Sequence, residues 1–219
     1  MRPVAWAALL AAPVMLGAAQ PATDWTRRVT QTTAGAFVLG NPAARTRLVE
    51  YVSYTCNHCA AFTGESSQPL KARVASGSTA VEVRHAVRDP LDLGATLLVR
   101  CAGPARFFAA HERVFSAQAE WYERGARYAQ ANEAALTKAP GRERVRMLAT
   151  AAGLPGLVGL SPAQAAACFA DKAAEARVLA MTDEAWAKRK IPGTPYFLVN
   201  GAGQDNVTSW AALAPRLGS

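Results

Sequence analysis

The chain of 219 residues carries 24 Lys and Arg against 16 Asp and Glu, a formal net charge of +8, and 51% of its residues are hydrophobic. This length and composition exclude a disordered protein and allow a sizeable buried core. The basic residues are intermixed with acidic ones, and no basic segment has the interleaved aromatics typical of a nucleic-acid surface. The sequence therefore predicts no nucleic-acid binding.

The N-terminus has the three-part form of a secretory signal: a basic Arg2, an apolar run over 4–16 and small residues up to Ala19. A membrane anchor needs about 18 or more apolar residues. This run is shorter, and Pro13 interrupts it. We expect cleavage after Ala19, a mature chain of residues 20–219 and a location in the periplasm.

The first strands and helix occur in the order of an α/β protein. A short strand-like piece at 36–40 precedes a buried strand at 47–54, rich in β-branched and aromatic residues. Thr55 is a candidate cap for a helix over 56–75, and the alternating segment 80–88 predicts a second strand. Together these elements form a βαβ unit.

A helical block interrupts this α/β pattern. Residues 91–190 are almost wholly helical in character, strand character returns at 195–201, and a short helix follows from Ser209. The last strand has no nearby partner except the first sheet. We therefore predict one domain over residues 20–219, in which the helical block is an insertion into an α/β core.

Two cysteines three residues apart, in the stretch "YTCNHC", stand where the first strand meets the helix. At a helix start, unsatisfied N–H groups and the helix dipole would favour a thiolate at Cys56. Cys59 lies one turn further on the same face, close enough to bond, and His58 could add a charge or a hydrogen bond. A redox pair is favoured, and a structural clip remains an alternative.

Metal binding is the other alternative for this pair. A zinc site built from all four cysteines would need two close pairs, and only one exists. Cu(I) binding by Cys56, Cys59 and His58 stays open, because a soft thiolate pair in an exported protein suits that ion. Thiol exchange fits the pair better, and it requires no bound cofactor.

Two further features point to the same region. Thr194 and Pro195, in "GTPYF", precede the last strand, where either a cis proline or an ordinary trans proline could stand. Glu50 lies in the middle of the buried strand. A carboxylate there costs stability unless it is partnered, which makes it a functional candidate.

Strand, "CNHC" at a helix start, second strand, helical insertion and "GTP" before a last strand together resemble the thioredoxin-fold thiol:disulfide oxidoreductases of the DsbA type. The resemblance implies that Cys56 is the exposed nucleophile and Cys59 the resolving thiol. It also implies that Pro195 is a cis proline and that Glu50 is the buried acid that handles the proton of the resolving thiol. One departure is Asn57, which stands where the family's strong oxidants have proline, so the resemblance leaves the redox potential open.

The resemblance also implies partners: reduced or unfolded exported proteins as substrates, and a membrane-bound oxidase that resets the cysteine pair. A reductase or isomerase running the same exchange in the other direction is the alternative within the fold. An isomerase usually carries a separate dimerisation segment, and residues 20–39 leave little room for one, so the direction of disulfide donation is favoured.

The remaining cysteines, Cys101 and Cys168, both fall in apolar helical surroundings of the insertion. An even number of cysteines in an exported chain favours a structural disulfide between them. Two unpaired buried thiols and a second redox couple are the alternatives, and the absence of CxxC spacing disfavours the latter.

Overall fold

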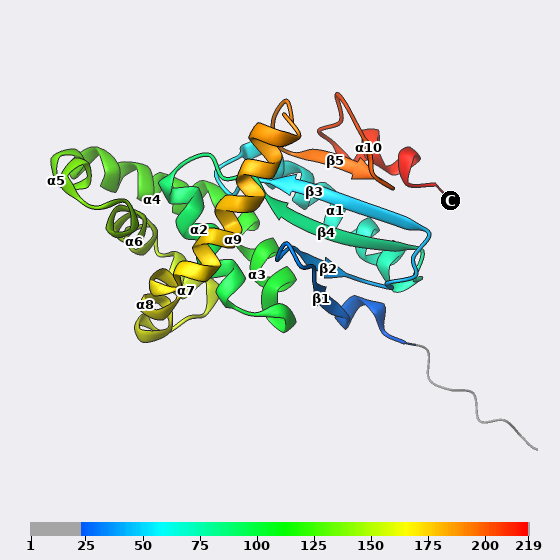
Figure 1. Ribbon diagram of the computed structural model, residues 1–219, viewed down its shortest axis with the longest axis horizontal. Helices are drawn as coiled ribbons and strands as arrows, with labels where there is room; N and C mark the ends of the chain where they lie inside the picture. Colours follow the sequence, from blue (N-terminus) through cyan, green and yellow to red (C-terminus); the bar gives the residue numbers. More distant parts are fainter. Residues whose placement is uncertain (1–22, 219) are drawn as a thin grey trace, which may run out of the picture.

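The computed structural model describes residues 23–218 (Figure 1). The predicted secretory signal lies outside these residues. The core is a mixed six-stranded sheet with the strand order β1-β2-β4-β3-β5-β6. The strands are β1 (Val29–Gln31), β2 (Phe37–Leu39), β3 (Thr46–Val52), β4 (Thr79–His85), β5 (Tyr196–Val199) and β6 (Ala202–Gly203).

The predicted βαβ unit is confirmed. Helix α1 (Asn57–Ala75) connects β3 to β4, and the two strands are parallel neighbours in the centre of the sheet. Strand β5, which follows the helical block, returns to pair antiparallel with β3, so Glu50 lies opposite Phe197. The helical block is therefore an insertion into a thioredoxin-like core. The sequence predicts this arrangement, because the last strand has no possible partner except the first sheet.

The short edge strands β1 and β6 were not predicted. Each has at most three residues, most of them exposed, so neither produces a readable apolar alternation. Thr55 does not cap α1, because its hydroxyl donates instead to Asp89 Oδ2 at 2.6 Å. Cys56 occupies the N-cap position, and the helix begins at Asn57.

The insertion consists of short helices packed against one another and against the sheet (Figure 1). They are α2 (Pro90–Cys101), α3 (Pro104–Ser116), α4 (Gln118–Ala131), α5 (Glu133–Lys138), α6 (Gly141–Ala151), α7 (Leu154–Val158), α8 (Pro162–Ala170), α9 (Lys172–Asp183) and the π-helical turn η2 (Glu184–Lys188). The remaining elements are η1 (Trp25–Arg27), α10 (Trp210–Leu213) and η3 (Ala214–Leu217). No helix within residues 23–218 is both long enough and apolar enough to span a bilayer.

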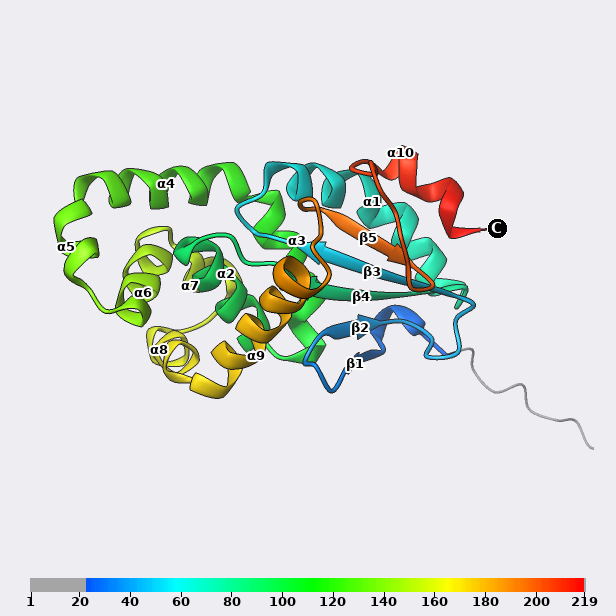
Figure 2. The ribbon, with the colours of Figure 1, turned by 45° about the horizontal axis from the view of Figure 1, so that its top comes forward.

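Alternate side chains of β3 serve opposite faces of the sheet, as the period of a strand requires. Leu48 packs in a cluster with Leu70 of α1 and Leu213 of α10. Val49 packs on the other face with Ala185 of η2. Figure 2 shows α1 and α10 together on one side of the sheet, with α9 crossing the other. Burial on both faces fixes β3, whose C-terminal end carries the cysteine loop.

A disulfide joins Cys101, at the end of α2, to Cys168 in α8, with their Cα atoms 5.9 Å apart. It ties the first helix of the insertion to a late one across 67 residues of chain. In the structure, Cys56 and Cys59 are free thiols.

Candidate active site

The cysteine pair lies where β3 ends and α1 begins, beyond the carboxyl end of a central strand. Cys56 has extended backbone angles at the N-cap position, and its amide donates to the carbonyl oxygen of Ser53 at 3.2 Å. The first N–H groups of a helix have no partner within the helix, so those of His58 and Cys59 are directed at the Cys56 sulfur. The loop thus aims a positive helix end at one sulfur atom.

This surrounding stabilises a thiolate at Cys56. A hydrogen bond from the Cys59 side chain is the largest cause that lowers the pKa of Cys56, from 9.0 to about 5. Burial opposes it, whereas the Thr194 side chain and the N–H groups of Cys59 and His58 lower the pKa further. A thiol with this pKa is ionised at neutral pH.

Cys59 has the opposite character. It is buried, and desolvation together with the neighbouring Cys56 raises its pKa well above 9.0. When reduced, the pair therefore consists of one thiolate and one thiol, which differ because one sulfur lies at the helix end and the other lies a turn deeper.

The loop before β5 lies against the same sulfur. The Thr194–Pro195 peptide bond is cis, the only cis bond in residues 23–218. The Cys56 thiol donates to the Thr194 carbonyl oxygen at 3.1 Å, a bond open only to the protonated form. The Thr194 hydroxyl, in contrast, favours the thiolate. The structure thus brings Thr194 and Pro195 beside the cysteine pair.

Two details differ from the sequence-based expectations. Cys56 is only 3% exposed, not openly exposed, because the Thr194 carbonyl and the Cys59 side chain pack against its sulfur. The His58 side chain is exposed and makes no hydrogen bond to any other residue of 23–218. His58 therefore acts on Cys56 through its backbone N–H.

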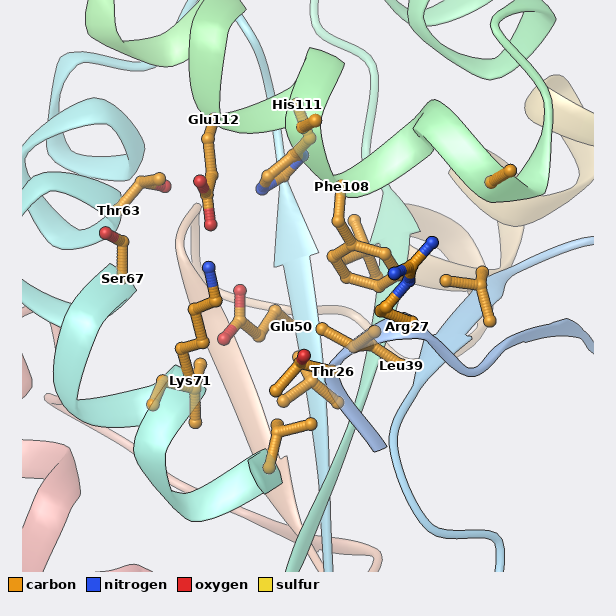
Figure 3. Close-up of a pocket in the computed structure, with 17 residues that line it drawn as sticks. Thr26, Arg27, Leu39, Glu50, Thr63, Ser67, Lys71, Phe108, His111 and Glu112 are labelled. Atoms are coloured by element: carbon orange, nitrogen blue, oxygen red, sulfur yellow. The ribbon is translucent and has the colours of Figure 1, made fainter. Parts of the chain in front are cut away.

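Glu50 is 4% exposed, and its Oε1 atom has no hydrogen-bond partner among the described residues. Desolvation raises its pKa from 4.5 to about 8, so the carboxyl is mostly protonated at neutral pH. Figure 3 shows it on the wall of a cavity of about 330 Å³ that Lys71, Thr63 and Glu112 also line. The cavity is large and polar enough to hold water.

The helical insertion makes hydrogen bonds to the cysteine loop, and these contacts were not predicted from the sequence. Asp92, fully buried at the start of α2, accepts hydrogen bonds from the Ser53 hydroxyl at 2.6 Å and the Tyr54 amide at 2.8 Å. Burial raises the pKa of Asp92 to about 7. Asp89 accepts a hydrogen bond from the Thr55 hydroxyl. The motif "DPLD" is a readable helix start, but its bonding partners are not readable from the sequence.

A third contact comes from the next part of the insertion. Gln118, at the first position of α4, donates to the carbonyl oxygens of Tyr54 at 2.7 Å and Cys56 at 2.9 Å. The Tyr54 side chain is buried, and its hydroxyl lies 2.9 Å from Nδ1 of His111 on α3. No sequence signal identifies Gln118. Three insertion helices therefore contact the loop that carries Cys56.

Metal coordination by a larger cluster has no support in the part of the chain that the structure describes. No group of three or more His, Cys, Asp or Glu side chains there is arranged to hold an ion.

Comparison with known proteins agrees with this geometry. A family model described as Thioredoxin matches residues 32–215. The chain belongs to the thioredoxin family. This match spans five of the six strands, β2 to β6, the cysteine loop and the whole helical insertion.

Relatives of this thioredoxin-family chain include proteins of Rickettsia bellii and Rickettsia typhi named as protein-disulfide oxidoreductases. They are 29% and 31% identical over 172 and 173 residues, 78% of this chain in each case. The chain spans only 59% and 56% of their lengths, a little over half.

Solved structures give the same fold. The protein-disulfide isomerase from Novosphingobium aromaticivorans is 35% identical, with a TM-score of 0.77 over 83% of this chain and 97% of that one. Wolbachia pipientis alpha-DsbA1 is 20% identical, with a TM-score of 0.66 over 85% and 91% of the two chains. The core with its helical insertion is therefore a DsbA-like form of the thioredoxin fold.

Proposed function

We propose that this protein is a thiol:disulfide oxidoreductase that donates disulfides to protein substrates through Cys56 and Cys59. The observation that carries the proposal is the contrast within the pair, where the pKa of Cys56 is lowered to about 5 and that of Cys59 is raised. A pair whose reduced form holds a stabilised thiolate is a strong electron acceptor. The names of its relatives point to the same reaction class.

The reaction starts from the oxidised pair. A substrate thiolate attacks the Cys56 sulfur, which forms a mixed disulfide and breaks the Cys56–Cys59 bond, and Cys59 leaves and takes up a proton. A second substrate thiolate then attacks the substrate sulfur of the mixed disulfide. Cys56 departs as the thiolate that the helix end and Thr194 stabilise. The substrate gains one disulfide, and the pair gains two electrons.

Glu50 is the proposed proton source for Cys59. Its pKa of about 8 keeps it protonated at neutral pH, and it lies on the wall of a polar cavity through which water could exchange the proton. Thr194 and Pro195 are the proposed contact for the substrate backbone, because the loop before β5 lies beside Cys56 and offers backbone groups to an extended segment.

We further propose that the chain is exported to the periplasm. The N-terminal segment has the composition of a cleaved secretory signal, and a disulfide between Cys101 and Cys168 persists in an oxidising compartment. Its substrates there are reduced or unfolded exported proteins, and a membrane-bound oxidase reoxidises the pair.

Disulfide isomerisation is the second candidate, because the relative at 35% identity is named a protein-disulfide isomerase. Isomerisation requires the pair to be reduced at the start, whereas donation requires it to be oxidised. The low pKa of Cys56 favours donation, since a stabilised thiolate makes the oxidised pair easy to reduce and its disulfide a strong oxidant.

The test is an equilibration of the purified protein with glutathione buffers, followed by measurement of the reduction potential of the Cys56–Cys59 pair. A potential well above that of the glutathione pool supports donation, and one near that of thioredoxin overturns it. The Cys59→Ser variant, incubated with a reduced protein substrate and with oxidised glutathione as the oxidant, should accumulate mixed disulfides between Cys56 and the substrate. The Cys56→Ser variant is the matched control and should accumulate none.

A further inference from the structure

A second cavity lies against the Cys101–Cys168 disulfide. It has a volume of about 210 Å³ and is lined by segments from β1, β2, α2 and α9. Its walls combine two arginines, Arg100 and Arg177, with apolar side chains such as Phe37 and Leu97. This size suits a molecule of a few non-hydrogen atoms.

Arg100 is a buried cation without a counter-charge in its contacts. It is 8% exposed, its Nη2 donates to the carbonyl oxygen of Gly35 at 2.7 Å, and its guanidinium lies 5.0 Å from the centroid of the Phe37 ring. Its Nε and Nη1 atoms have no hydrogen-bond partner within residues 23–218. A buried charge that lacks an opposite charge is strongly unfavourable.

A second positive charge increases this imbalance. Arg177 lines the same cavity and makes no ion pair with any described residue, and its charge helps burial to lower the pKa of Arg100 to about 10. Both side chains approach Gly35, where an added Cβ would lie 3.3 Å from atoms of each. Figure 2 shows the turn between β1 and β2 close to α9.

The acidic residue of the cavity does not neutralise this pair. Asp171 is the only acidic residue among the described residues that line it. Its carboxylate caps α9 by accepting the Ala174 amide at 2.8 Å, and no ion pair joins it to either arginine. The net charge of the lining is therefore positive.

We propose that this cavity binds a small oxyanion, held by Arg100 and Arg177 beside the Cys101–Cys168 disulfide. The planar guanidinium presents its N–H groups in a fork that matches the two oxygens of a carboxylate or of a sulfate. Arg100 lines the cavity with a guanidinium that has no acidic partner among the described residues, and Arg177 supplies a second cation. The apolar walls accommodate a short hydrocarbon tail on a carboxylate.

Occupancy would connect segments that are far apart in the chain. The anion would bridge α2 and α9, beside the turn of the β1–β2 hairpin. The Gly35 carbonyl oxygen in this turn already accepts hydrogen bonds from the Arg100 and Gln31 side chains. Binding to the folded state alone stabilises a protein by mass action. The oxyanion would thus stabilise the junction between the insertion and the sheet.

The test is calorimetric titration of the purified protein, with its Cys101–Cys168 disulfide intact, against sodium propionate and sodium sulfate at constant ionic strength. Saturable binding of one anion per chain is expected, and binding of both anions identifies a general oxyanion site. Saturation by propionate alone identifies an organic carboxylate as the ligand. Absence of saturable binding by either anion overturns the proposal.

The exposed Arg177 allows a variant that should fold normally. Arg177→Gln should weaken the affinity by roughly tenfold or more, because it removes one charge-assisted contact. The matched control is Arg127→Gln, which removes an exposed arginine of α4 outside the cavity. Equal affinities of Arg177→Gln and wild type would place the anion elsewhere and overturn the assignment.

Discussion

The Cys56 sulfur and the Thr194 carbonyl oxygen lie 3.1 Å apart, although 138 residues of chain separate them. That chain contains α1, β4 and the helical insertion. The contact exists because β5 returns from the insertion to pair with β3, and the cis Thr194–Pro195 bond directly precedes β5. The surroundings of Cys56 are thus assembled from the loop after β3 and the loop before β5.

Removing the Thr194 hydroxyl should make the thiolate less stable. In Thr194→Val the pKa of Cys56 is expected to rise above about 5 by roughly one pH unit, because one hydrogen bond to the charged form is lost. The pH dependence of the alkylation rate of the reduced protein measures this. Thr208→Val, at an exposed position, is the control and should leave the profile unchanged. An unaltered profile in both variants would mean that the hydroxyl does not contact the sulfur.

Glu50 should make the protein less stable as the pH rises. Its folded pKa of about 8 exceeds the value of 4.5 it has when unfolded, so between these values the folded state binds more protons. The free energy of unfolding therefore falls with pH across that window. Asp92, with a pKa of about 7, contributes in the same direction.

Glu50→Gln should remove the Glu50 part of this slope. Between pH 5 and pH 8, the free energy of unfolding of the variant is expected to rise by about 2 to 4 kcal/mol relative to that of the wild type. One proton contributes about 1.4 kcal/mol for each pH unit, and water in the cavity reduces the effect. Urea unfolding at the two pH values measures it. Glu112→Gln, an exposed carboxyl on the same cavity, should show no such gain. Equal gains in unfolding free energy for the two variants would contradict the assignment of the pH dependence to the buried Glu50 carboxyl.

Local patterns made the central features predictable. The apolar run that contains Glu50, the CxxC spacing at a helix start and the breakers around the insertion each depend on neighbouring residues, so the sequence indicates β3, α1 and the helical block. The contacts of the cysteine loop were not predictable. Asp92 and Gln118 reach it from 38 and 64 residues beyond Tyr54, and only the packing of the insertion brings them there.

Gln118 should stabilise the folded state, because its side-chain amide donates hydrogen bonds to backbone carbonyl groups of the cysteine loop. Gln118→Ala leaves the buried Tyr54 carbonyl without its partner, whereas the Cys56 carbonyl keeps the Ala60 amide at 3.2 Å. The expected loss is about 1 to 3 kcal/mol of unfolding free energy. Urea unfolding checks it against Gln130→Ala, an exposed glutamine of the same helix. A loss of the same size in both variants would point to helix propensity instead.

The Cys101–Cys168 disulfide should stabilise the fold without tuning the redox pair. It closes 67 residues of chain, and the chain-entropy relation gives about 4 kcal/mol for a loop of that length. Cys101→Ala/Cys168→Ala should lose stability of that order in urea unfolding. The pKa of Cys56 should stay near 5, because neither cysteine is among the groups that set it.

The single variant Cys101→Ala separates the bond from the packing of its sulfur atoms. Cys101 is exposed and Cys168 is buried, so the single variant breaks the bond but keeps the buried thiol. If the link between α2 and α8 is the main contribution, the single and double variants lose stability to within about 1 kcal/mol of each other. A much smaller loss in the single variant would assign the effect to the packing of Cys168 and not to the disulfide.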